Sequence, residues 1–435
     1  MDLRSKLRAI VRPENAPRRE LTYEPDHGCY EAGIEPGRVG EILGGRTVET
    51  RFGTCLAIDR RYEANRRHGE VSIEECQLPG AHSLRVLDPT LLVDAGLGRA
   101  VFIDLETTGL SGGAGTVAFL VGCGYFDVGA FQVRQFLLTS YSGERALLEA
   151  VSHFFDDADL IVTYNGKTFD VPVMETRWSF HRMEAPLQGV PHFDTLHAAR
   201  RLWKARMEDA AAGDGGCRLS TLERALFDVR RVGDVPGMEI PSRFFRFLRS
   251  GDPRPLEPVL EHNRLDLVSL AAVTARAARL VDDGADGCPD PAQALALGRV
   301  YERAGAVDRA EACYRRAAAS GVAVVRGEGL YRLGLRWRRD RRFDEAADAW
   351  RSIITMTDRG AFRRTPAGAA LRDFAVEALA IHHEHRDRDL LAARELAMFA
   401  LEEGPDARRA DGYRHRLARL ERKIARKENA QLLWS

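Results

Sequence analysis

VFIDLETTGL, residues 101–110, starts as an apolar run and then carries two acids, Asp104 and Glu106. This stretch decides how the surrounding domain folds and what it can do. Side chains alternate along a β-strand, so both acids would project from the same face. Two carboxylates side by side repel each other, and burying them without a partner is costly. We therefore expect a positive charge between them, most simply a divalent metal ion.

The residues around this stretch have the pattern of a sheet covered by helices. Three strand-like runs are joined by short or Gly-rich turns, which predicts a meander of three strands. Helix-like and strand-like segments then alternate, which predicts an α/β fold with a mixed sheet flanked by helices. The expected strands lie at 100–106, 116–127, 130–138, 159–165 and 189–196, and the expected helices at 143–158, 167–182 and 196–203.

The composition is that of an ordinary globular protein. The chain has 435 residues, of which 45% are hydrophobic and 29% charged, and this length is enough for two or three domains. Lys plus Arg and Asp plus Glu both number 64, so the net charge is zero. No overall field attracts a polyanion, and any nucleic-acid site must be a local patch.

Cysteine usage and hydropathy indicate where the protein works. The seven cysteines are scattered and include no C-x-x-C pair, which argues against a disulfide framework and a zinc ribbon and favours a reducing compartment. The first residues have no signal-peptide core, and no apolar run is long enough to span a bilayer. We expect a cytoplasmic protein without a membrane partner.

The sequence of the first 98 residues predicts the least about fold and function. Pro and Gly are frequent there and short β-like pieces occur, so residues 1–98 are assigned to an N-terminal region of unclear fold with short strands and loops. A basic cluster within it is either a solvated loop, which we favour, or a patch that contacts phosphates. The cluster consists of Arg60, Arg61, Arg66, Arg67 and His68.

The last third, residues 288–435, has the pattern of helical repeats. Segments 294–317 and 330–353 can be superimposed with a shift of about one tetratricopeptide period. Small residues fall where helices must approach closely, and a weaker third copy and a basic closing helix follow. Chance self-similarity of a degenerate helical pattern is the alternative. Such repeats would bind a protein partner.

Two further segments carry candidate site residues. Asp170 lies just inside a predicted helix, after a turn made by Asn165 and Gly166. His262 and Asp266 are spaced i and i+4, on one face of another predicted helix. An acid in a first helical turn and a solvated helix face are ordinary features by themselves. Together with residues 101–110, however, the three segments form a consistent set.

These segments resemble a known superfamily. Asp104-x-Glu106 with TTGL, Asn165-x-x-x-Phe169-Asp170 and His262-x-x-x-Asp266 are similar to the three motifs of the DEDD superfamily of 3′–5′ exonucleases, which has the RNase H-like fold. Residues 164–174, 193–203 and 230–252 resemble the YprB-like family of uncharacterised bacterial proteins more closely. The resemblance implies an RNase H-like exonuclease domain at 99–282, followed by tetratricopeptide repeats.

The resemblance also implies a metal site. Two Mg²⁺ or Mn²⁺ ions would activate water and stabilise the charge that develops on the phosphate. His262 would act as the general base or would orient the attacking water. Three residues separate His262 from Asp266, which is the spacing of the superfamily's tyrosine branch, whereas its histidine branch usually has four. The implied metal ligands are Asp104, Glu106, Asp170 and Asp266.

Other positions resemble substrate contacts of the superfamily. Thr107, Thr108 and Leu110 would meet the terminal nucleotide, and Asn165 and Phe169 would lie near the scissile end. A tight turn and a core Phe are the alternatives for these positions. Two other features have a favoured structural interpretation. We expect Asp194 to cap a helix rather than join the acids. We expect the basic residues around Trp203 to lie on an amphipathic surface helix rather than to bind a nucleic-acid strand; they are Arg200, Arg201, Lys204 and Arg206.

The function predicted is that of a divalent-metal-dependent 3′–5′ exonuclease, which hydrolyses single-stranded RNA or DNA by a two-metal-ion mechanism. The sequence does not choose between RNA and DNA. One alternative is a scaffold whose repeats recruit a protein and whose nuclease-like domain only binds nucleic acid. Another is an RNase H-type endonuclease, since the same metal chemistry serves both reactions.

Overall fold

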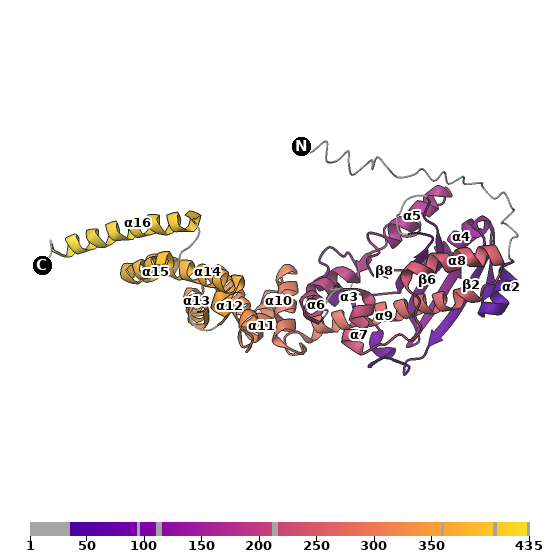
Figure 1. Ribbon diagram of the computed structural model, residues 1–435, viewed down its shortest axis with the longest axis horizontal. Helices are drawn as coiled ribbons and strands as arrows, with labels where there is room; N and C mark the ends of the chain where they lie inside the picture. The colour runs from indigo at the N-terminus through magenta and orange to yellow at the C-terminus, as the bar shows by residue number, and fades with distance from the viewer. Residues whose placement is uncertain are drawn as a thin grey trace, which may run out of the picture.

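The computed structural model describes residues 35–93, 96–109, 115–210, 216–357, 361–402 and 407–432. An α/β domain lies at one end of the molecule and a row of helices extends from it (Figure 1). The last helix, α16 (Ala407–Leu432), lies at the far end of this row. Within the described ranges, no helix is both long and apolar enough to cross a membrane.

The α/β domain is built on a mixed seven-stranded sheet with the order β1-β2-β7-β6-β5-β8-β9. Neighbours from β1 to β5 are antiparallel, whereas β5/β8 and β8/β9 are parallel. The predicted meander is confirmed, because β5, β6 and β7 follow one another in the chain and in the sheet. The strands are β1 (Arg46–Thr50), β2 (Gly53–Tyr62), β5 (Ala100–Thr107), β6 (Ala118–Asp127), β7 (Ala130–Leu137), β8 (Leu160–Thr163) and β9 (His192–Asp194).

Helices cover both faces of the sheet, which is why its strands read as nearly continuous apolar runs. On one face Ile103 and Leu105 of β5 belong to a core shared with α4 (Glu144–Phe154) and α8 (Ile240–Ser250). On the other face Phe102 belongs to a second core, shared with the long helix α9 (Glu257–Asp283). Successive residues of β5 therefore point into different cores.

The N-terminal region contributes to this same sheet. β1 and β2 are hydrogen-bonded to each other and, through β2, to β7, so the sheet includes residues that the sequence analysis assigned to a separate region. In the basic cluster, Arg60 and Arg61 are exposed, but His68 is buried and its Nε2 lies 2.8 Å from Ser269 Oγ of α9. Burial lowers the pKa of His68 to about 4, so a charged contact between His68 and phosphate is excluded.

The helices after α9 are arranged in pairs. A Cβ atom added to Gly298 would lie 2.6 Å from the ring of Tyr314, and one added to Gly334 would lie 2.5 Å from Trp350 Nε1. Glycine thus admits an aromatic ring at corresponding positions of two successive pairs. The pairs are α10 (Pro291–Arg303) with α11 (Val307–Ala318), α12 (Ala323–Arg339) with α13 (Phe343–Thr357), and α14 (Pro366–His382) with α15 (Leu390–Glu402).

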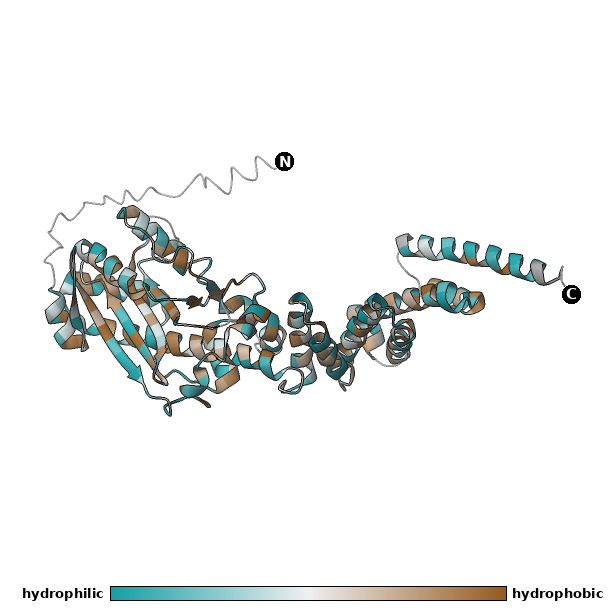
Figure 2. Cartoon of the chain, turned by 180° about the vertical axis from the view of Figure 1, so that it is seen from behind, coloured by the Kyte–Doolittle hydropathy of each residue, from teal (hydrophilic) through white to brown (hydrophobic). Residues whose placement is uncertain are grey.

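The closing helix α16 is hydrophilic along most of its length (Figure 2). It is attached through Glu384, whose fully buried carboxylate forms ion pairs with Arg416, Arg419 and Lys423 of α16. Hydrogen bonds from Arg419 and Lys423 outweigh the effect of burial and lower the pKa of Glu384 to about 2. This carboxylate is therefore charged at neutral pH.

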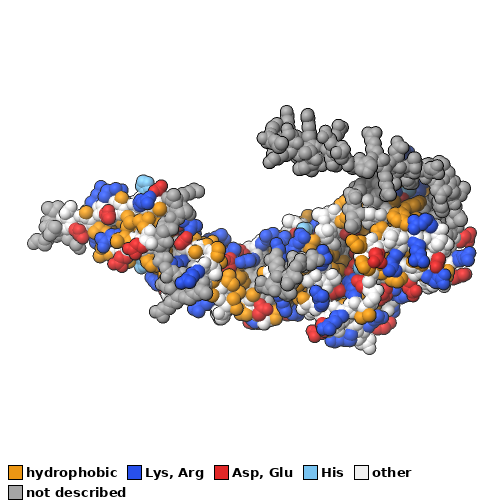
Figure 3. Space-filling view, viewed as in Figure 1, with side chains coloured by type: hydrophobic (Ala, Val, Ile, Leu, Met, Phe, Trp, Pro, Cys, Tyr) orange, Lys and Arg blue, Asp and Glu red, His pale blue; other side chains and the backbone are white. Residues whose placement is uncertain are grey.

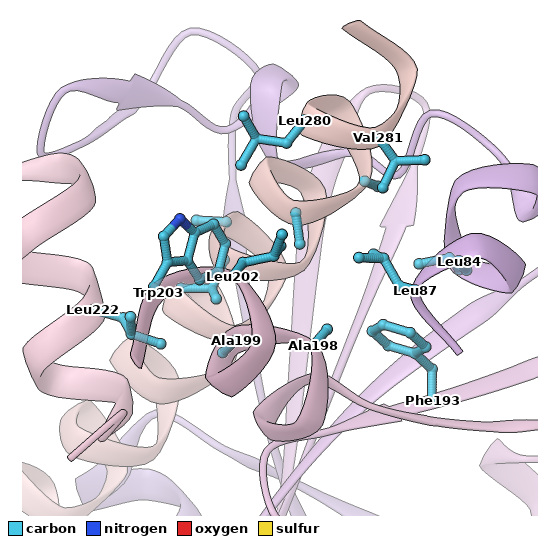
Figure 4. Close-up of a cluster of buried hydrophobic side chains, with 14 of the residues drawn as sticks. Leu84, Leu87, Phe193, Ala198, Ala199, Leu202, Trp203, Leu222, Leu280 and Val281 are labelled. Carbon is cyan, nitrogen blue, oxygen red and sulfur yellow. The ribbon is translucent and has the colours of Figure 1, made fainter. Parts of the chain in front are cut away.

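The first helix pair shares its core with the α/β domain. Leu297 and Tyr301 of α10 belong to the same buried cluster as Leu202 and Trp203 of α6 (Thr195–Ala210). Figure 4 shows Trp203 and Leu202 of this cluster together with Leu280 and Val281 of α9. Polar contacts add to the apolar ones. Gln293 donates a hydrogen bond to the Leu202 carbonyl, and Tyr301 and Arg309 donate to the Val281 carbonyl.

The burial of Trp203 decides how α6 is interpreted. Only 1% of this side chain is exposed, so the interpretation in which it stacks on a nucleic-acid base is wrong. The favoured interpretation, an amphipathic surface helix, is confirmed: Leu202 and Met207 are buried beside Trp203, while Arg200 and Lys204 are exposed.

Because of this shared core, a chain that ends at residue 287 is expected to unfold at a clearly lower temperature than the full chain. Its α6 and α9 would lose the apolar cover of α10, and each large side chain exposed costs about 1.5–3 kcal/mol. Thermal unfolding followed by circular dichroism measures the difference. A chain ending at residue 402, which lacks only α16 and the residues after it, is the control and should keep the stability of the α/β domain. Equal stability of the 1–287 chain would contradict the shared core.

Candidate active site

Strand β5 presents Asp104 and Glu106 on the face that carries Phe102, under α9. Leu105, between them, is buried in the core of the opposite face. The two acids are neither fully buried nor fully exposed as residues. Period-2 alternation therefore brings both carboxylates to the side of the sheet where α9 lies, as the sequence analysis predicted for their common face.

Asp170 reaches β5 from the parallel neighbour β8. β8 pairs with residues Ala100 to Phe102 of β5. After β8 the chain turns at Asn165, which has a left-handed φ of 68°. Helix α5 (Asp170–Phe180) then begins at Asp170 itself. The Asp170 carboxylate is near its own backbone N–H and that of Leu105, and both groups lower its pKa. It therefore lies beside the strand between Asp104 and Glu106.

Asp194 stabilises this turn from the next strand, β9. Its Oδ1 accepts from the backbone N–H of Asn165 at 2.8 Å and its Oδ2 from that of Lys167 at 3.1 Å. The same Oδ1 also accepts from the N–H of Leu196, in the first turn of α6, at 3.1 Å. The favoured interpretation of Asp194 as a helix cap is therefore confirmed, and the residue also holds the loop that leads to Asp170, whose pKa the charge of Asp194 raises.

Helix α9 contributes His262 and Asp266 and is anchored to β5 by Asn263. The Asn263 side chain is fully buried and its Nδ2 donates to Asp104 Oδ2 at 2.8 Å and to the Asp104 carbonyl at 3.1 Å. Gln135 of β7 donates to Asn263 Oδ1 at 2.7 Å. Gly122 of β6, opposite Asp104 in the sheet, leaves the space that Asn263 occupies. These contacts fix the distance between α9 and the two acids of β5.

The acids interact electrostatically as one group. Burial raises the pKa of Asp104, and the charges of Asp266, Glu106 and Asp170 raise it further. Burial likewise raises the pKa of Glu106, followed by the charges of Asp266 and Asp170. For Asp170, burial outweighs its backbone hydrogen bonds and raises the pKa to about 7. Asp104, Glu106 and Asp170 therefore lie close enough to Asp266 for its charge to oppose their ionisation.

Asp266 differs from the other three acids because an arginine reaches it. Arg231 Nη2 donates to Asp266 Oδ1 at 2.5 Å, and the same guanidinium binds Glu223 of α7 (Leu219–Phe227) at 2.7 and 2.9 Å. The Arg231 side chain is only 8% exposed. Across the described ranges, no group of three or more His, Cys, Asp or Glu side chains is arranged as a ready metal site.

The donor chemistry nevertheless fits a hard divalent cation. All four candidate ligands are carboxylates, and oxygen ligands are what Mg²⁺ and Mn²⁺ prefer. Repulsion between Asp104, Glu106 and Asp170 is the condition that a bound cation would relieve. Asp266 would have to turn from Arg231, or share its second oxygen, to complete such a set.

His262 is held at both ring nitrogens. Nδ1 lies 2.6 Å from Asp234 Oδ1, and Nε2 lies 3.4 Å from Asp266 Oδ2. The ring therefore has one edge toward the segment before α8 and the other toward the acids. Nε2 is the nitrogen that faces the site.

The predicted substrate contacts have structural partners. Thr107 is buried and donates to the Gly109 carbonyl at 2.8 Å, and the Thr108 hydroxyl accepts from the Val117 N–H at 3.1 Å. Asn165 is exposed and its Oδ1 accepts from Thr168, while Phe169 is half-buried against the core. Leu110 lies outside the described residues. A contact of these residues with substrate stays a prediction.

Three residues of the site were not among the sequence candidates: Asn263, Arg231 and Asp234. Asn263 follows His262 directly, so its place on α9 was visible, but its contact with Asp104 depends on the distance between helix and strand. Arg231 and Asp234 lie in segment 230–252, where no local pattern indicates chemistry. A cavity of about 560 Å³ opens beside them, with the exposed side chains of Arg224 and Arg230 in its lining.

Gly122→Ala is expected to displace Asn263 and so to disturb the site. The added Cβ would lie 2.2 Å from Asn263 Oδ1, so α9 or the Asn263 side chain must move and the contact with Asp104 is lost. Overpacking of this kind costs about 1–3 kcal/mol of the free energy of unfolding. Chemical denaturation measures it. Gly37→Ala in α2 (Pro36–Leu43), where a Cβ meets nothing within 4 Å, is the control, and equal stability of the two variants would contradict this packing.

Comparison with known proteins agrees with this architecture. Residues 101–278 match the family model of the RNase H superfamily, and this range contains the meander, α5 and most of α9. The uncharacterized protein YprB of Bacillus subtilis (strain 168) is 29% identical to this chain over 387 residues, which cover 85% of this chain and 86% of that protein. The chain is thus similar to YprB over most of its length, and its α/β domain, which has an RNase H-like fold, is followed by a helical region.

Proposed function

We propose that this protein uses its RNase H-like domain as a divalent-metal-dependent nuclease, and that it removes nucleotides from the 3′ end of single-stranded RNA or DNA. The observation that carries the proposal is the mutual electrostatic effect of four acids from distant segments: each of Asp104, Glu106 and Asp170 has its pKa raised partly by Asp266. Structural acids are normally paired with a cation, whereas strongly perturbed acids that face one another indicate a functional site.

The side chains would divide the work as follows. Asp104, Glu106, Asp170 and Asp266 would hold two Mg²⁺ or Mn²⁺ ions. Bound there, such ions supply the positive charge that stabilises a phosphate during in-line displacement. Asn263 keeps the Asp104 carboxylate in place through its hydrogen bond. His262 directs Nε2 toward the acids, where it can accept a proton from water or orient it.

Local charge supports a nucleic-acid substrate. Acidic and basic side chains are interspersed over the face of the α/β domain seen in Figure 3, so no single large basic face is present in that view. Arg224 and Arg230 line the cavity beside Asp234 and could contact phosphates of the strand that enters the site. The described cysteines are all buried and none of them forms a disulfide with another, which agrees with work in the cytoplasm, and we include this location in the proposal.

The test uses single-stranded RNA and DNA oligonucleotides of the same sequence, labelled at the 5′ end, with Mg²⁺ or Mn²⁺. A 3′–5′ exonuclease shortens the labelled strand one nucleotide at a time, and a blocked 3′ end prevents this. Internal fragments from structured or hybrid substrates would instead indicate an RNase H-type endonuclease. If neither nucleic acid is degraded with either metal, the proposed function is wrong.

The helical region supports a second candidate function. Its two glycine–aromatic contacts occur at corresponding positions of successive helix pairs, as tetratricopeptide repeats require, and such repeats recruit proteins. The chain would then be a scaffold with a weakly active or inactive nuclease-like domain. One stable partner that binds the full chain but not a chain ending at residue 357, together with negative nuclease assays, would favour this candidate.

A further inference from the structure

The segment between α7 and α8 brings a second carboxylate to His262. Asp234 Oδ1 lies 2.6 Å from His262 Nδ1, whereas the contact of Asp266 with Nε2 is longer, at 3.4 Å. Asp234 is therefore the primary hydrogen-bond partner of the ring. This geometry leaves Nε2 on the side of the acid cluster.

Asp234 is itself fixed. Its Oδ1 also accepts from the Val235 backbone N–H at 2.9 Å, and its Oδ2 lies 3.3 Å from Arg231 Nη1. Arg231 in turn is bound by Glu223 and reaches Asp266, so one nearly buried guanidinium joins Asp234 to an acid of the site. Burial opposes the charge on Asp234, but the hydrogen bond with His262 and the charges of His262 and Arg231 lower its pKa. The carboxylate is an acceptor only.

An acceptor at Nδ1 determines which nitrogen of a neutral imidazole carries the proton. With Asp234 at Nδ1, the proton stays on Nδ1 and the lone pair lies on Nε2, which faces the acids. A ring without this partner could rotate or carry its proton on Nε2, where it could not accept one from water. The orientation of His262 thus depends on a residue that is not one of the four expected metal ligands, although its charge also raises the pKa of Glu106.

We infer that Asp234 is a positioning residue, which holds His262 with its proton on Nδ1 and its unprotonated Nε2 directed at the acid cluster, where the reacting water would bind. This inference rests on the proposed function, and it assigns a role to a residue that neither the sequence motifs nor the comparisons identify. Asp234 contacts neither metal nor substrate in this account. It acts through His262 alone.

Asp234→Asn is the sharpest test. The amide has the same size, and its oxygen can replace Oδ2 beside Arg231, which puts its NH₂ group where Oδ1 meets His262. A merely structural role predicts normal activity. In our account the amide can donate to Nδ1 and force the proton onto Nε2, so kcat falls about 10–100-fold while KM and the thermal midpoint change little. Asp228→Asn is the matched control, because Asp228 is exposed on the same connecting segment and its carboxylate pairs with Arg230 rather than with His262.

A double-mutant cycle tests whether the effect passes through the ring. With His262→Ala in place, Asp234→Asn should cost nothing further, whereas an independent role would make the two losses multiply. Mn²⁺ affinity should be the same in Asp234→Asn and in the unmodified chain. A loss of Mn²⁺ binding would assign Asp234 to the metal site and overturn the inference.

A readout without activity separates this inference from the proposed function. In long-range ¹H–¹⁵N spectra at pH 8, the His262 ring, assigned with His262→Ala, should carry its proton on Nδ1 in the unmodified chain and lose this preference in Asp234→Asn. Absent nuclease activity with this spectrum would refute the proposed function and leave the Asp234–His262 pairing standing. A proton on Nε2 in the unmodified chain would overturn the inference even if the nuclease is active.

Discussion

Asp104→Asn and Asp170→Asn are each expected to lower the rate of oligonucleotide hydrolysis by about 10³-fold or more while the chain stays folded. Both residues lie at the centre of the acid cluster, on β5 and at the first residue of α5. Each amide removes one negative charge and one charged oxygen ligand but keeps the size of the side chain. Initial rates on a 5′-labelled oligonucleotide in saturating Mg²⁺ measure the effect.

The control for this loss is Asp157→Asn, which makes the same chemical change at an exposed position after α4. It should leave the rate unchanged. Circular dichroism must show the same helical content in all variants, since a loss of fold would give the same kinetic result. If Asp104→Asn keeps a rate within about threefold of the unmodified chain, the acids do not form the catalytic centre.

Without metal, Asp170→Asn is expected to be more stable than the unmodified chain at pH 8, and this difference should shrink as the pH falls toward 5. Burial raises the pKa of Asp170 to about 7 in the folded protein, from an ordinary value of 3.8. A raised pKa contributes stability that is present below the ordinary value and is lost as the pH rises through about 7. The full loss is on the order of 4 kcal/mol at most.

Thermal midpoints in the presence of a chelator, measured from pH 5 to pH 8, give this difference. Replacing Asp104 or Glu106 by its amide should change the stability in the same direction, because the pKa values of both acids are raised as well. Adding Mn²⁺ at pH 8 should stabilise the unmodified chain by several degrees and Asp170→Asn much less, since a ligand that binds only the folded state raises its stability. A midpoint difference that is independent of pH would mean that Asp170 ionises normally.

Local patterns predicted most of the fold. The strands at 100–106 and 116–138 and the helix with His262 and Asp266 were visible because their hydrophobic periods are long and bounded by turns. β1 and β2 were not assigned to the sheet, because Arg60 and Arg61 interrupt the apolar pattern on the exposed side of β2. Their place is determined by pairing with β7, which lies about seventy residues later in the chain, and no local signal carries such a contact.

The residues of the candidate site likewise fall into two groups, those that local sequence patterns identify and those that they do not. Asp104, Glu106, Asp170 and Asp266 were selected from residue type and spacing. Asn263, Arg231 and Asp234 act across gaps between elements: Asn263 reaches β5 because Gly122 leaves room, and Arg231 crosses from the segment after α7 to α9. Such contacts depend on tertiary distances, and polar residues that make them look like ordinary surface residues in the sequence.

The same limit applies to the helical region. The glycine and aromatic positions of the repeats were visible, but the core shared by α10, α6 and α9 was not, because it joins segments on both sides of a predicted domain boundary. The boundary between the α/β domain and the helical region is therefore less sharp in the structure than in the sequence. The row of helices begins inside the core of the α/β domain, and its first pair also holds the end of α9.

In our proposal, four acids from three segments form one cation site. Crystals of the full chain soaked in Mn²⁺ and measured for anomalous scattering test it most directly. We predict anomalous peaks with carboxylate oxygens of Asp104, Glu106, Asp170 and Asp266 at about 2.0–2.3 Å, and Asp266 turned at least partly away from Arg231. Mn²⁺ bound elsewhere, with these four carboxylates empty and Asp266 still paired with Arg231, would contradict the account.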